Sequence, residues 1–434
     1  MKQLPSCAAF TALLAVTVSP SLSAQLPRPS VYQTTLEEPN QKTAEITTEE
    51  LLAILAARSE PVFDVRTAKE YAIAHVPGTI NVYEKEVDRI TELYPDRSTP
   101  MILYCNGPSC GKSKRTSEQL VAFGYTNVRR YQLGLPVWRA LSQTVQTDME
   151  GFAYIFGGDR TAVFVDARTP AEFATATVPG AVSIRAGEAT AANDDGRLPF
   201  QDKGTRIVVF GQTADQARIV AAEIAKKAYW NSSYFGGTVA DLALAGYINH
   251  RPVAIARNAT VAAGRQCTAA IAPAAVDGGS FDPDGADSVA LTIEPAGPLN
   301  LGSHNVTLIA TDGHGAQSRS SSIVTVTDQT APTIAGFSVD KTELWPPDHR
   351  MEPVTIAYAT TDSCGSVATQ VIVTTSGGGN VTGDWQLVDA HHVYLRAERA
   401  GGDDRLYWIT VVATDGAGNQ SASSLGVRVP SSMR

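Results

Sequence analysis

The segment PVFDVRTAKEYAIAHVPGTINV, Pro61 to Val82, returns later in the chain as AVFVDARTPAEFATATVPGAVSI, Ala162 to Ile184. Five residues keep one constant spacing between the two segments: Asp64, Arg66, Glu70, Pro77 and Gly78 recur as Asp166, Arg168, Glu172, Pro179 and Gly180. A match of this kind at a fixed distance is the signature of an internal repeat. We therefore expect two copies of one domain in the first half of the chain.

Each copy alternates short β-branched runs with stretches of helical spacing. In the first copy, Thr47 and Glu50 form a capping box ahead of apolar residues at 51, 52, 54 and 55, which predicts a helix. A second apolar run follows in each copy, ILYC at 102–105 and VVFG at 208–211. Strands that alternate with helices predict an α/β domain with a mostly parallel sheet, whose sites lie beyond the carboxyl ends of the strands.

The two copies differ where this second run ends. The first copy has Cys105 at that position and the second has Gly211. When Tyr131 is aligned with Tyr234, the first copy has three extra residues after the strand. We therefore expect the first copy to carry the reactive cysteine and a longer loop.

The loop after Cys105 has the composition of an anion cradle. Glycines let the backbone turn its N–H groups inward, and a proline stiffens the turn. We expect Ser113 to cap a helix that continues to Phe123, and Lys112 to supply a positive charge for a small anion. A cysteine that faces a helix N-terminus is expected to have a lowered pKa and to react as a thiolate. The predicted loop comprises Asn106, Gly107, Pro108, Ser109, Cys110, Gly111, Lys112 and Ser113.

Cys105 and Cys110 also allow other interpretations. Cys105 is either a functional thiol or an ordinary buried cysteine at the end of a strand. Cys110 can exchange electrons with Cys105 or form a structural disulfide. Two thiolates without nearby histidines cannot fill a zinc site, so no metal is expected here. Lys112 lacks the bidentate grip of an arginine, which disfavours phosphoryl chemistry.

The order of these motifs resembles the rhodanese family in its tandem form. The resemblance rests on DVRTAKEYAIAHVPGTINV, LYCNGPSCGKS and YQLGLPVW, which cover about residues 42–144, with a degenerate second copy to about residue 247. It implies that Cys105 carries sulfane sulfur as a persulfide. The loop of six residues before Lys112 is longer than the usual loop of that family, which ends in an arginine.

Asp64 and Arg66 recur in the copy that lacks the cysteine. A buried ion pair or turn anchor therefore explains them better than a chemical role does. His75 becomes Thr177 in the second copy, and we expect it to be a partly exposed histidine in a turn. The second copy is expected to be a structural or docking partner that covers one side of the site.

The first 24 residues predict export. Lys2, the apolar stretch AAFTALLAVTV and the small residues SLSA before Gln25 are typical of a cleaved secretory signal. No later segment approaches the roughly 20 apolar residues that a spanning helix needs. The net charge of −9 is spread without a basic stripe, which argues against a nucleic-acid partner. We expect a periplasmic, secreted or cell-surface protein.

From about residue 255 the helical spacing gives way to short alternating runs, the pattern of antiparallel β-sandwiches. A second repeat, ATDGHGAQS at 310–318 and ATDGAGNQS at 413–421, predicts two modules with an Asp-Gly hairpin between their last two strands. The modules resemble hyalin-repeat and immunoglobulin-like domains of secreted bacterial proteins. That resemblance implies a role in spacing, or in attachment to a surface or a partner protein.

Several polar residues in this half are possible metal ligands, but their spacing does not favour metal binding. Asp282, Asp284 and Asp287 lack the terminal Glu of a full calcium loop, so we expect a plain turn. His391 and His392 point to opposite faces of a strand and do not suit a single ion.

The cysteines outside the signal are too few for a disulfide-built scaffold, so the domains must rest on hydrophobic cores. They are Cys105, Cys110, Cys267 and Cys364. Cys267 and Cys364 lie in different predicted sandwiches. A bridge between them depends on a Cα separation that sequence does not supply.

The expected organisation is a signal at 1–24, a linker at 25–43, a rhodanese-like domain at 44–146, a degenerate copy at 150–250, and immunoglobulin-like modules at 256–330 and 331–430. The expected function is transfer of sulfane sulfur from a donor such as thiosulfate to a thiophilic acceptor through Cys105, without a cofactor. The alternatives are a catalytically weak tandem that binds an anion or a partner, and a dithiol redox protein that uses Cys105 and Cys110.

Overall fold

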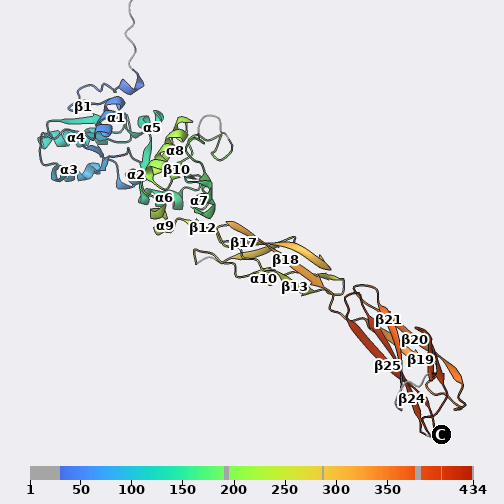
Figure 1. Cartoon of the computed structure of the whole chain (residues 1–434). Coiled ribbons are helices and arrows are strands. Elements are labelled where there is room, and N and C mark those ends of the chain that lie inside the picture. The colour runs from blue at the N-terminus through green and yellow to red at the C-terminus, as the bar shows by residue number, and fades with distance from the viewer. Residues whose placement is uncertain (1–29, 190–194, 286–287, 377–382, 402, 433–434) are drawn as a thin grey trace, which may run out of the picture. The chain divides into compact units, whose positions relative to one another are not determined.

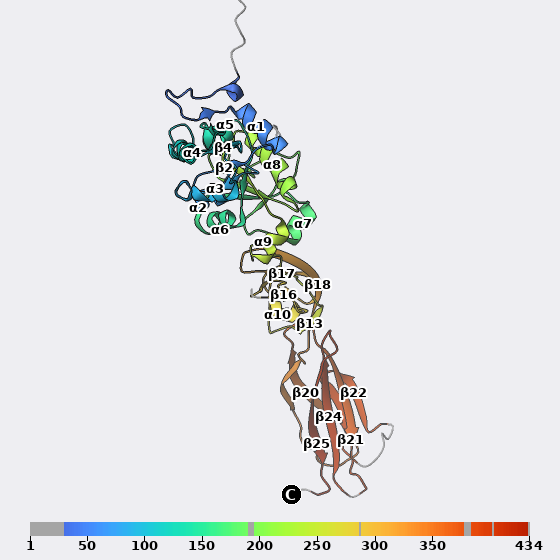
Figure 2. The same ribbon diagram turned by 90° about the vertical axis from the view of Figure 1, so that its left-hand side faces the viewer.

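A computed structural model of the chain describes residues 30–189, 195–285, 288–376, 383–401 and 403–432. The chain forms two compact units, one of residues 1–173 with 177–248 and one of residues 174–176 with 249–434. Figures 1 and 2 show their helices and strands. The predicted signal lies outside the described residues. Within the described part of the chain, no helix combines the length and the apolar character needed to cross a bilayer.

The first copy is a five-stranded parallel sheet in the order β1-β5-β4-β2-β3, which confirms the predicted α/β fold. Its strands are β1 (Ala44–Glu45), β2 (Val62–Asp64), β3 (Ile80–Asn81), β4 (Met101–Tyr104) and β5 (Val128–Tyr131). Its helices are η1 (Val31–Gln33), α1 (Thr48–Ala57), α2 (Ala68–Ile73), η2 (Glu84–Glu86), α3 (Asp88–Leu93), α4 (Lys112–Ala122) and α5 (Gly134–Ala140).

Local sequence accounts for these elements. The Thr47 side chain accepts a hydrogen bond from the Glu50 N–H, and the Glu50 carboxylate accepts one from the Thr47 N–H, so the predicted capping box starts α1. All four residues of β4 are buried, as a central parallel strand requires. Residues 30–43 also pack on this copy, because Glu38 pairs with Arg130 and the Tyr32 hydroxyl donates to the Leu141 carbonyl.

The second copy repeats the fold in the order β6-β11-β10-β7-β9. Its strands are β6 (Val145–Thr147), β7 (Val163–Asp166), β8 (Ala176–Thr177), β9 (Val182–Ser183), β10 (Ile207–Phe210) and β11 (Ser232–Phe235), and its helices are α6 (Met149–Gly158), α7 (Pro170–Thr175), α8 (Ala214–Lys226) and α9 (Val239–Leu244). Strand register corrects one detail. Tyr131 pairs with the last residue of β4, whereas Tyr234 pairs with Val209, one residue before the end of β10. The first copy is therefore two residues longer here, not three.

The two copies pack against each other through α2 and α6. Asp148, just before α6, donates its N–H to the Ala72 carbonyl, and Gly151 lies against the same carbonyl. His75 and Gln146 exchange two backbone hydrogen bonds, of 3.0 and 2.9 Å. The prediction of a partly exposed His75 is wrong. Its side chain stacks on Tyr71 at 3.7 Å and it is only 2% exposed, because strand β6 of the second copy covers it.

The second unit is built almost entirely of strands, which confirms the all-β prediction at that level. Its first half contains β12 (Asn249–His250), β13 (Ala259–Ala262), β14 (Thr268–Ala269), α10 (Pro273–Val276), β15 (Ala290–Glu294), β16 (Leu299–Asn300), β17 (Gly302–Thr311) and β18 (Gln317–Thr327). The four-stranded sheet runs β13-β18-β17-β15, and β13 pairs with β18 in parallel, unlike the expected antiparallel pattern. The predicted hairpin joins β17 and β18.

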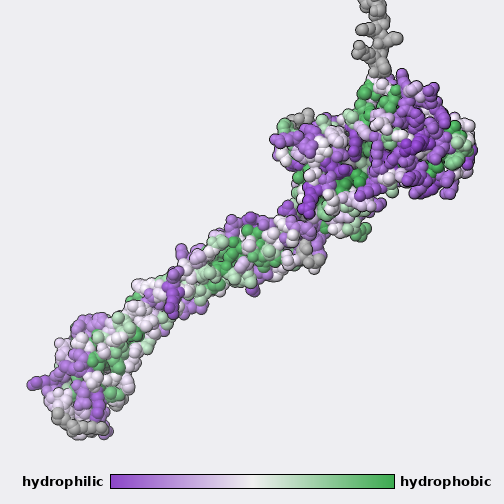
Figure 3. Space-filling view, turned by 180° about the vertical axis from the view of Figure 1, so that it is seen from behind, coloured by the Kyte–Doolittle hydropathy of each residue, from purple (hydrophilic) through white to green (hydrophobic). Residues whose placement is uncertain are grey.

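The second half of this unit places two antiparallel sheets around one apolar core. Sheet β19-β20-β23-β22 and sheet β21-β24-β25 both contribute to it. The strands are β19 (Thr333–Val339), β20 (Met351–Thr361), β21 (Ala368–Thr375), β22 (Trp385–Asp389), β23 (His392–Arg396), β24 (Arg405–Thr414) and β25 (Gln420–Val429). Exposed and covered residues alternate along strands such as β15, and Figure 3 shows polar and apolar residues interspersed on the face in view.

Most of the polar residues considered as ligands have ordinary partners. Asp282 accepts the Asp284 N–H through one carboxylate oxygen, while its other oxygen is buried without a hydrogen-bond partner among the described residues. Asp284 accepts hydrogen bonds from the backbone and ring of His250, while Asp287 lies outside the described residues. The His391 ring contacts Tyr358 and the His392 ring contacts Asp389, so the two histidines do not converge.

Candidate active site

Cys105 follows directly after β4, at the carboxyl end of the central strand of the first copy. Its side chain belongs to the apolar core and is only 1% exposed. Sγ donates to the Cys110 carbonyl at 3.3 Å and lies 3.3 Å from the Ser113 hydroxyl. The thiol is therefore enclosed by its own loop.

The loop is tied to the strand beside it. Gly107 has a φ of 108°, a left-handed conformation that favours glycine, and its carbonyl accepts the Cys110 N–H at 2.9 Å. The Gln132 side chain donates to the carbonyls of Pro108 and Cys110, at 3.2 Å in each case. Gln132 follows β5 within the YQLGLPVW motif, yet sequence reasoning did not assign it a role. It closes the loop because β5 lies next to β4.

Ser113 does not cap α4. The helix begins at Lys112, Gly111 precedes it, and no side chain caps it. Ser113 instead lies buried in the first turn, where its hydroxyl donates to the Gln132 amide oxygen at 3.0 Å. Its position places the hydroxyl against the Cys105 sulfur rather than against free backbone amides.

The predicted low pKa of Cys105 is wrong for this arrangement. Burial raises the pKa of the Cys105 thiol to about 11, and the nearby Cys110 side chain acts in the same direction. Hydrogen bonds from Ser113 oppose this shift but do not outweigh it. Cys105 is therefore a protonated thiol at neutral pH in this conformation.

Lys112 is paired with a residue that the sequence did not place in the site. Its Nζ lies 3.4 Å from a carboxylate oxygen of Glu70, and Asn106 donates to the other oxygen at 2.6 Å. Burial opposes ionisation, but hydrogen bonds from Thr67 and Asn106 and the charge of Lys112 lower the pKa of Glu70 to about 2. The charge of Lys112 is thus largely balanced. Glu70 recurs in the second copy as Glu172 at the same spacing, and this is the sequence feature that could have drawn attention to it. Glu172, however, has no cysteine loop beside it.

Asp64 and Arg66 form a buried ion pair in the first copy, and Asp166 and Arg168 form the equivalent pair in the second. Arg66 also donates to the Ala74 carbonyl at 2.7 Å and to the Asn106 side chain at 3.3 Å. The pair therefore holds the end of β2, the turn after α2 and the start of the cysteine loop together.

A cavity of about 280 Å³ lies beside this loop, between the two copies. Its walls are Arg66, Glu70, Ile73, Ala74, Asn106, Leu135, Pro136, Arg139, Arg206 and Trp230. Arg206 and Trp230 come from the second copy, so it forms one wall of this cavity. Larger hollows of about 440 and 720 Å³ also lie on the unit. The first shares Ile73 and Arg206 with this cavity, but no residue of the cysteine loop lines either of them.

One positive charge on the cavity wall, that of Arg139, was missed by sequence reasoning, whereas Arg66 and Arg206 are paired with Asp64 and Asp159. The Nε of Arg139 is buried and has no hydrogen-bond partner among the described residues. Burial and the charges of Arg206 and Arg66 lower the pKa of Arg139 to about 10. An anion in the cavity would relieve this repulsion. Among the described residues, potential metal ligands lie close together at another position, where Asp328, Asp362 and Cys364 meet.

Comparison with known proteins finds a domain family, a sulfurtransferase and a transcriptional regulator. The model of the "Rhodanese-like domain" matches residues 47–141 and 155–241. Thiosulfate sulfurtransferase PspE of Escherichia coli is 41% identical over 86 residues, which are 18% of this chain and 80% of that protein. HTH-type transcriptional regulator Rv0324 of Mycobacterium tuberculosis is 34% identical over 95 residues, which are 22% of this chain and 41% of the regulator.

Two solved structures are similar to parts of this chain. A thiosulfate sulfurtransferase from Pseudomonas aeruginosa is 21% identical, with a TM-score of 0.22, over 46% of this chain and 42% of that one. A rhodanese from E. coli, determined with anions, is 36% identical, with a TM-score of 0.16, over 17% of this chain and 85% of that one.

Proposed function

Because the chain belongs to the rhodanese family, we propose that it is a sulfurtransferase in which Cys105 takes sulfur from an anionic donor of the thiosulfate type. The observation that carries this proposal is the position of Cys105, within the matched region 47–141, at the end of β4 and enclosed by a glycine-containing loop. The second copy has Gly211 at this point and supplies no nucleophile.

The proposed reaction has two displacement steps. The Cys105 thiolate attacks the outer sulfur of thiosulfate, the S–S bond of the donor breaks, and sulfite leaves with the bonding electrons. The Cys105 persulfide then loses its outer sulfur to a nucleophilic acceptor such as cyanide or a thiol, which regenerates the thiolate. Hydrogen bonds from Ser113 favour the ionised form of Cys105 and would support both thiolate stages.

Ionisation of Cys105 provides the direct test. Incubation of the full chain with thiosulfate should add one sulfur atom, about 32 Da, to the peptide that contains Cys105. Since the pKa of Cys105 is about 11, the rate should rise roughly tenfold per pH unit between about pH 7 and 10, as the thiolate fraction grows. Peptide mass spectrometry measures the added mass and the rate at which it appears at each pH. Addition of sulfur to another cysteine, or none at any pH, would contradict the proposal.

The cavity between the copies is proposed to hold the charged end of the donor. Arg206→Gln removes one positive wall residue that comes from the second copy and should raise the KM for thiosulfate about tenfold, with kcat changed less than twofold, because a charge-assisted contact is lost. Arg218→Gln is the matched control, since Arg218 lies in the same copy but does not line the cavity. Equal KM values for the two variants would show that the donor binds elsewhere.

A second candidate is dithiol redox exchange. The Cys110 side chain lies close enough to raise the pKa of Cys105, and Sγ of Cys105 donates to the Cys110 carbonyl. Two neighbouring thiols of this kind can close a disulfide when an oxidant or a persulfide is present. This reaction needs both sulfurs, whereas sulfur transfer needs only Cys105.

We also propose that the protein is exported and that the strands of its second unit form immunoglobulin-like modules. The pattern of residues 1–24 supports export, and the two sheets around a shared core in the last half of that unit support a sandwich. Such modules would space the sulfurtransferase from a surface or bind a partner protein.

A further inference from the structure

Two cysteines of the second unit meet although they are far apart in sequence. Cys267 lies in the turn between β13 and β14, and Cys364 lies in the turn between β20 and β21. The Cys267 sulfur is 2.6 Å from the carbonyl oxygen of Ser363, the residue before Cys364. The Cys364 sulfur is 4.0 Å from the carbonyl oxygen of Gly264, in the turn that carries Cys267. Each sulfur therefore contacts the turn that holds the other.

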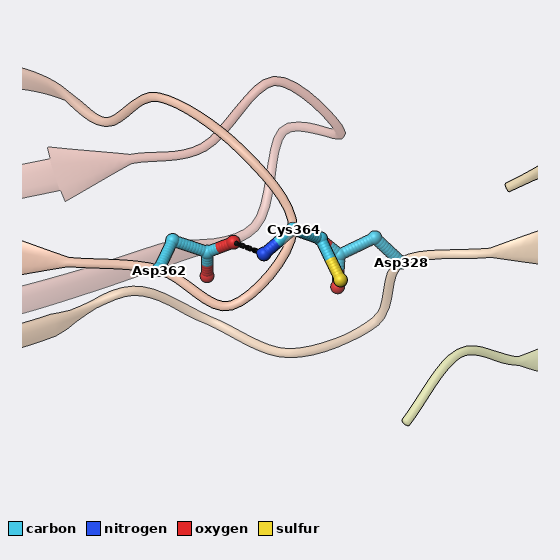
Figure 4. Close-up of side chains that lie close together, drawn as sticks. All are labelled: Asp328, Asp362 and Cys364. Carbon is cyan, nitrogen blue, oxygen red and sulfur yellow. Dashed lines mark hydrogen bonds between the residues drawn. The ribbon is translucent and has the colours of Figure 1, made fainter. Parts of the chain in front are cut away.

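Both turns hold their cysteines firmly. Cys267 has a φ of 59°, and its N–H donates to the Gly264 carbonyl at 2.9 Å. The Cys364 N–H donates to a carboxylate oxygen of Asp362 at 2.6 Å, the contact drawn in Figure 4. Cys364 also packs against the apolar core of the first half of the unit, which the strands β17 and β18 help to form. The contact thus joins the two halves of the unit.

The charges around the two thiols suit two alternatives, a disulfide or a bound cation. A hydrogen bond with Cys364, burial and the carboxylates of Asp328 and Asp362 raise the pKa of Cys267 to about 11. Conversion of the two thiols to a disulfide removes both titratable groups from the negative surroundings. A bound cation would also offset the negative charge of the two carboxylates. The second oxygen of Asp362 is buried and lacks a hydrogen-bond partner among the described residues, so a cation is the alternative to a disulfide at this position.

The ligand geometry favours the disulfide. Only Asp328, Asp362 and Cys364 bring their ligand atoms within 4.8 Å of one another among the described residues, and Cys267 is not part of that group. One oxygen of Asp328 already accepts the Thr330 N–H, and one of Asp362 accepts the Cys364 N–H. Three groups, of which one is a thiol, fall short of the four ligands of a structural zinc site.

We propose that Cys267 and Cys364 form a disulfide that links the two halves of the second unit. Two S–H bonds break and one S–S bond forms, and a small-molecule or protein disulfide accepts the two electrons and two protons as it is reduced to two thiols. The bond closes a loop of about 100 residues, which restricts the unfolded chain and so stabilises the folded unit.

Differential alkylation of the full chain tests the proposal. The folded protein is treated with oxidised glutathione, its free thiols are blocked, and it is denatured, reduced and labelled with a second alkylating reagent. Peptides with Cys267 and Cys364 should both carry the second label, and a non-reducing digest should contain the two peptides joined. In Cys267→Ser the joined peptide should be absent and Cys364 should carry the first label or a glutathione adduct.

Thermal unfolding should show one transition lowered by roughly 5 to 15 °C in either single Cys→Ser variant relative to the oxidised chain.

Three results would overturn the proposal. The first is a first label on both cysteines after oxidation. The second is a metal ion bound to the reduced chain, detected by native mass spectrometry and lost in Cys364→Ser, which would assign the place to a cation. The third is a joined peptide that contains either cysteine with Cys105 or Cys110. Sulfur transfer should be unchanged in Cys267→Ser, so the two proposals fail independently.

Discussion

Replacement of Cys105 by serine is expected to lower the rate of sulfur transfer from thiosulfate to cyanide at least about 1,000-fold. The hydroxyl of serine is a far weaker nucleophile than a thiolate at these pH values and cannot carry sulfane sulfur. The variant should fold, because the side chain of Cys105 is nearly isosteric with serine and lies beside Ser113 and a carbonyl that can accept its hydrogen bond. Thiocyanate formation measures the rate, and the thermal unfolding curve reports the fold.

Cys110→Ser is the matched control, since it changes a sulfur in the same loop. Sulfur transfer should persist within about fivefold, and it should rise slightly at neutral pH, because the Cys110 side chain raises the pKa of Cys105. Loss of activity in both variants, together with a native-state loss of two hydrogens that needs both cysteines, would assign the loop to dithiol exchange. Full activity in Cys105→Ser would place the nucleophile elsewhere and leave Cys105 as a core residue.

The second large effect is expected at the contact between the copies. A Cβ atom on Gly151 would lie 1.9 Å from the Ala72 carbonyl oxygen and 2.6 Å from the Ile73 nitrogen, both backbone atoms that cannot rotate away. Gly151→Ala must therefore push α6 from α2 and break the hydrogen bond between the Asp148 N–H and Ala72. The free energy of unfolding of the first unit should fall by about 3 kcal/mol.

The same change should also weaken the donor site, because separation of the copies moves Arg206 and Trp230 from the wall of the cavity. We expect a higher KM for thiosulfate in addition to the lower stability, measured by denaturant unfolding and steady-state kinetics. Gly157→Ala is the control in the same helix, since no atom lies within 4 Å of its Cβ position. It should be neutral or slightly stabilising. Equal behaviour of the two variants would mean that the copies do not pack as described.

Short-range patterns in the sequence predicted a large part of the first unit. The repeat identified the two copies, the Thr47 and Glu50 pair started α1 where expected, and the apolar run predicted at 102–105 became the central strand, Met101–Tyr104. These features depend on residues within a few positions of one another, so composition and spacing carry them. The alignment of Tyr131 with Tyr234 is wrong by one position, because two residues of the same type need not occupy the same register position in equivalent strands.

Sequence could place Cys105 at the end of a strand, because the strand and the cysteine are adjacent in the chain. It could not give the ionisation state of that cysteine. A helix N-terminus nearby argued for a thiolate, but the thiol is enclosed by a loop that Gln132, just after β5, holds closed at Cys110, and the resulting loss of hydration raises its pKa.

Partners brought together by the fold account for the other differences. Glu70 meets Lys112 across the loop, β6 of the second copy buries His75, and Arg139 faces Arg206 from the other copy. The contact of Cys267 with the turn of Cys364 is of the same kind. By itself, the sequence determined the repeat, the parallel α/β fold, the β-rich second half and the position of the candidate nucleophile, because local spacing encodes them. Only the tertiary structure decided burial, charge balance and the shared cavity, because these depend on the atoms that surround a group in space and not on its neighbours along the chain.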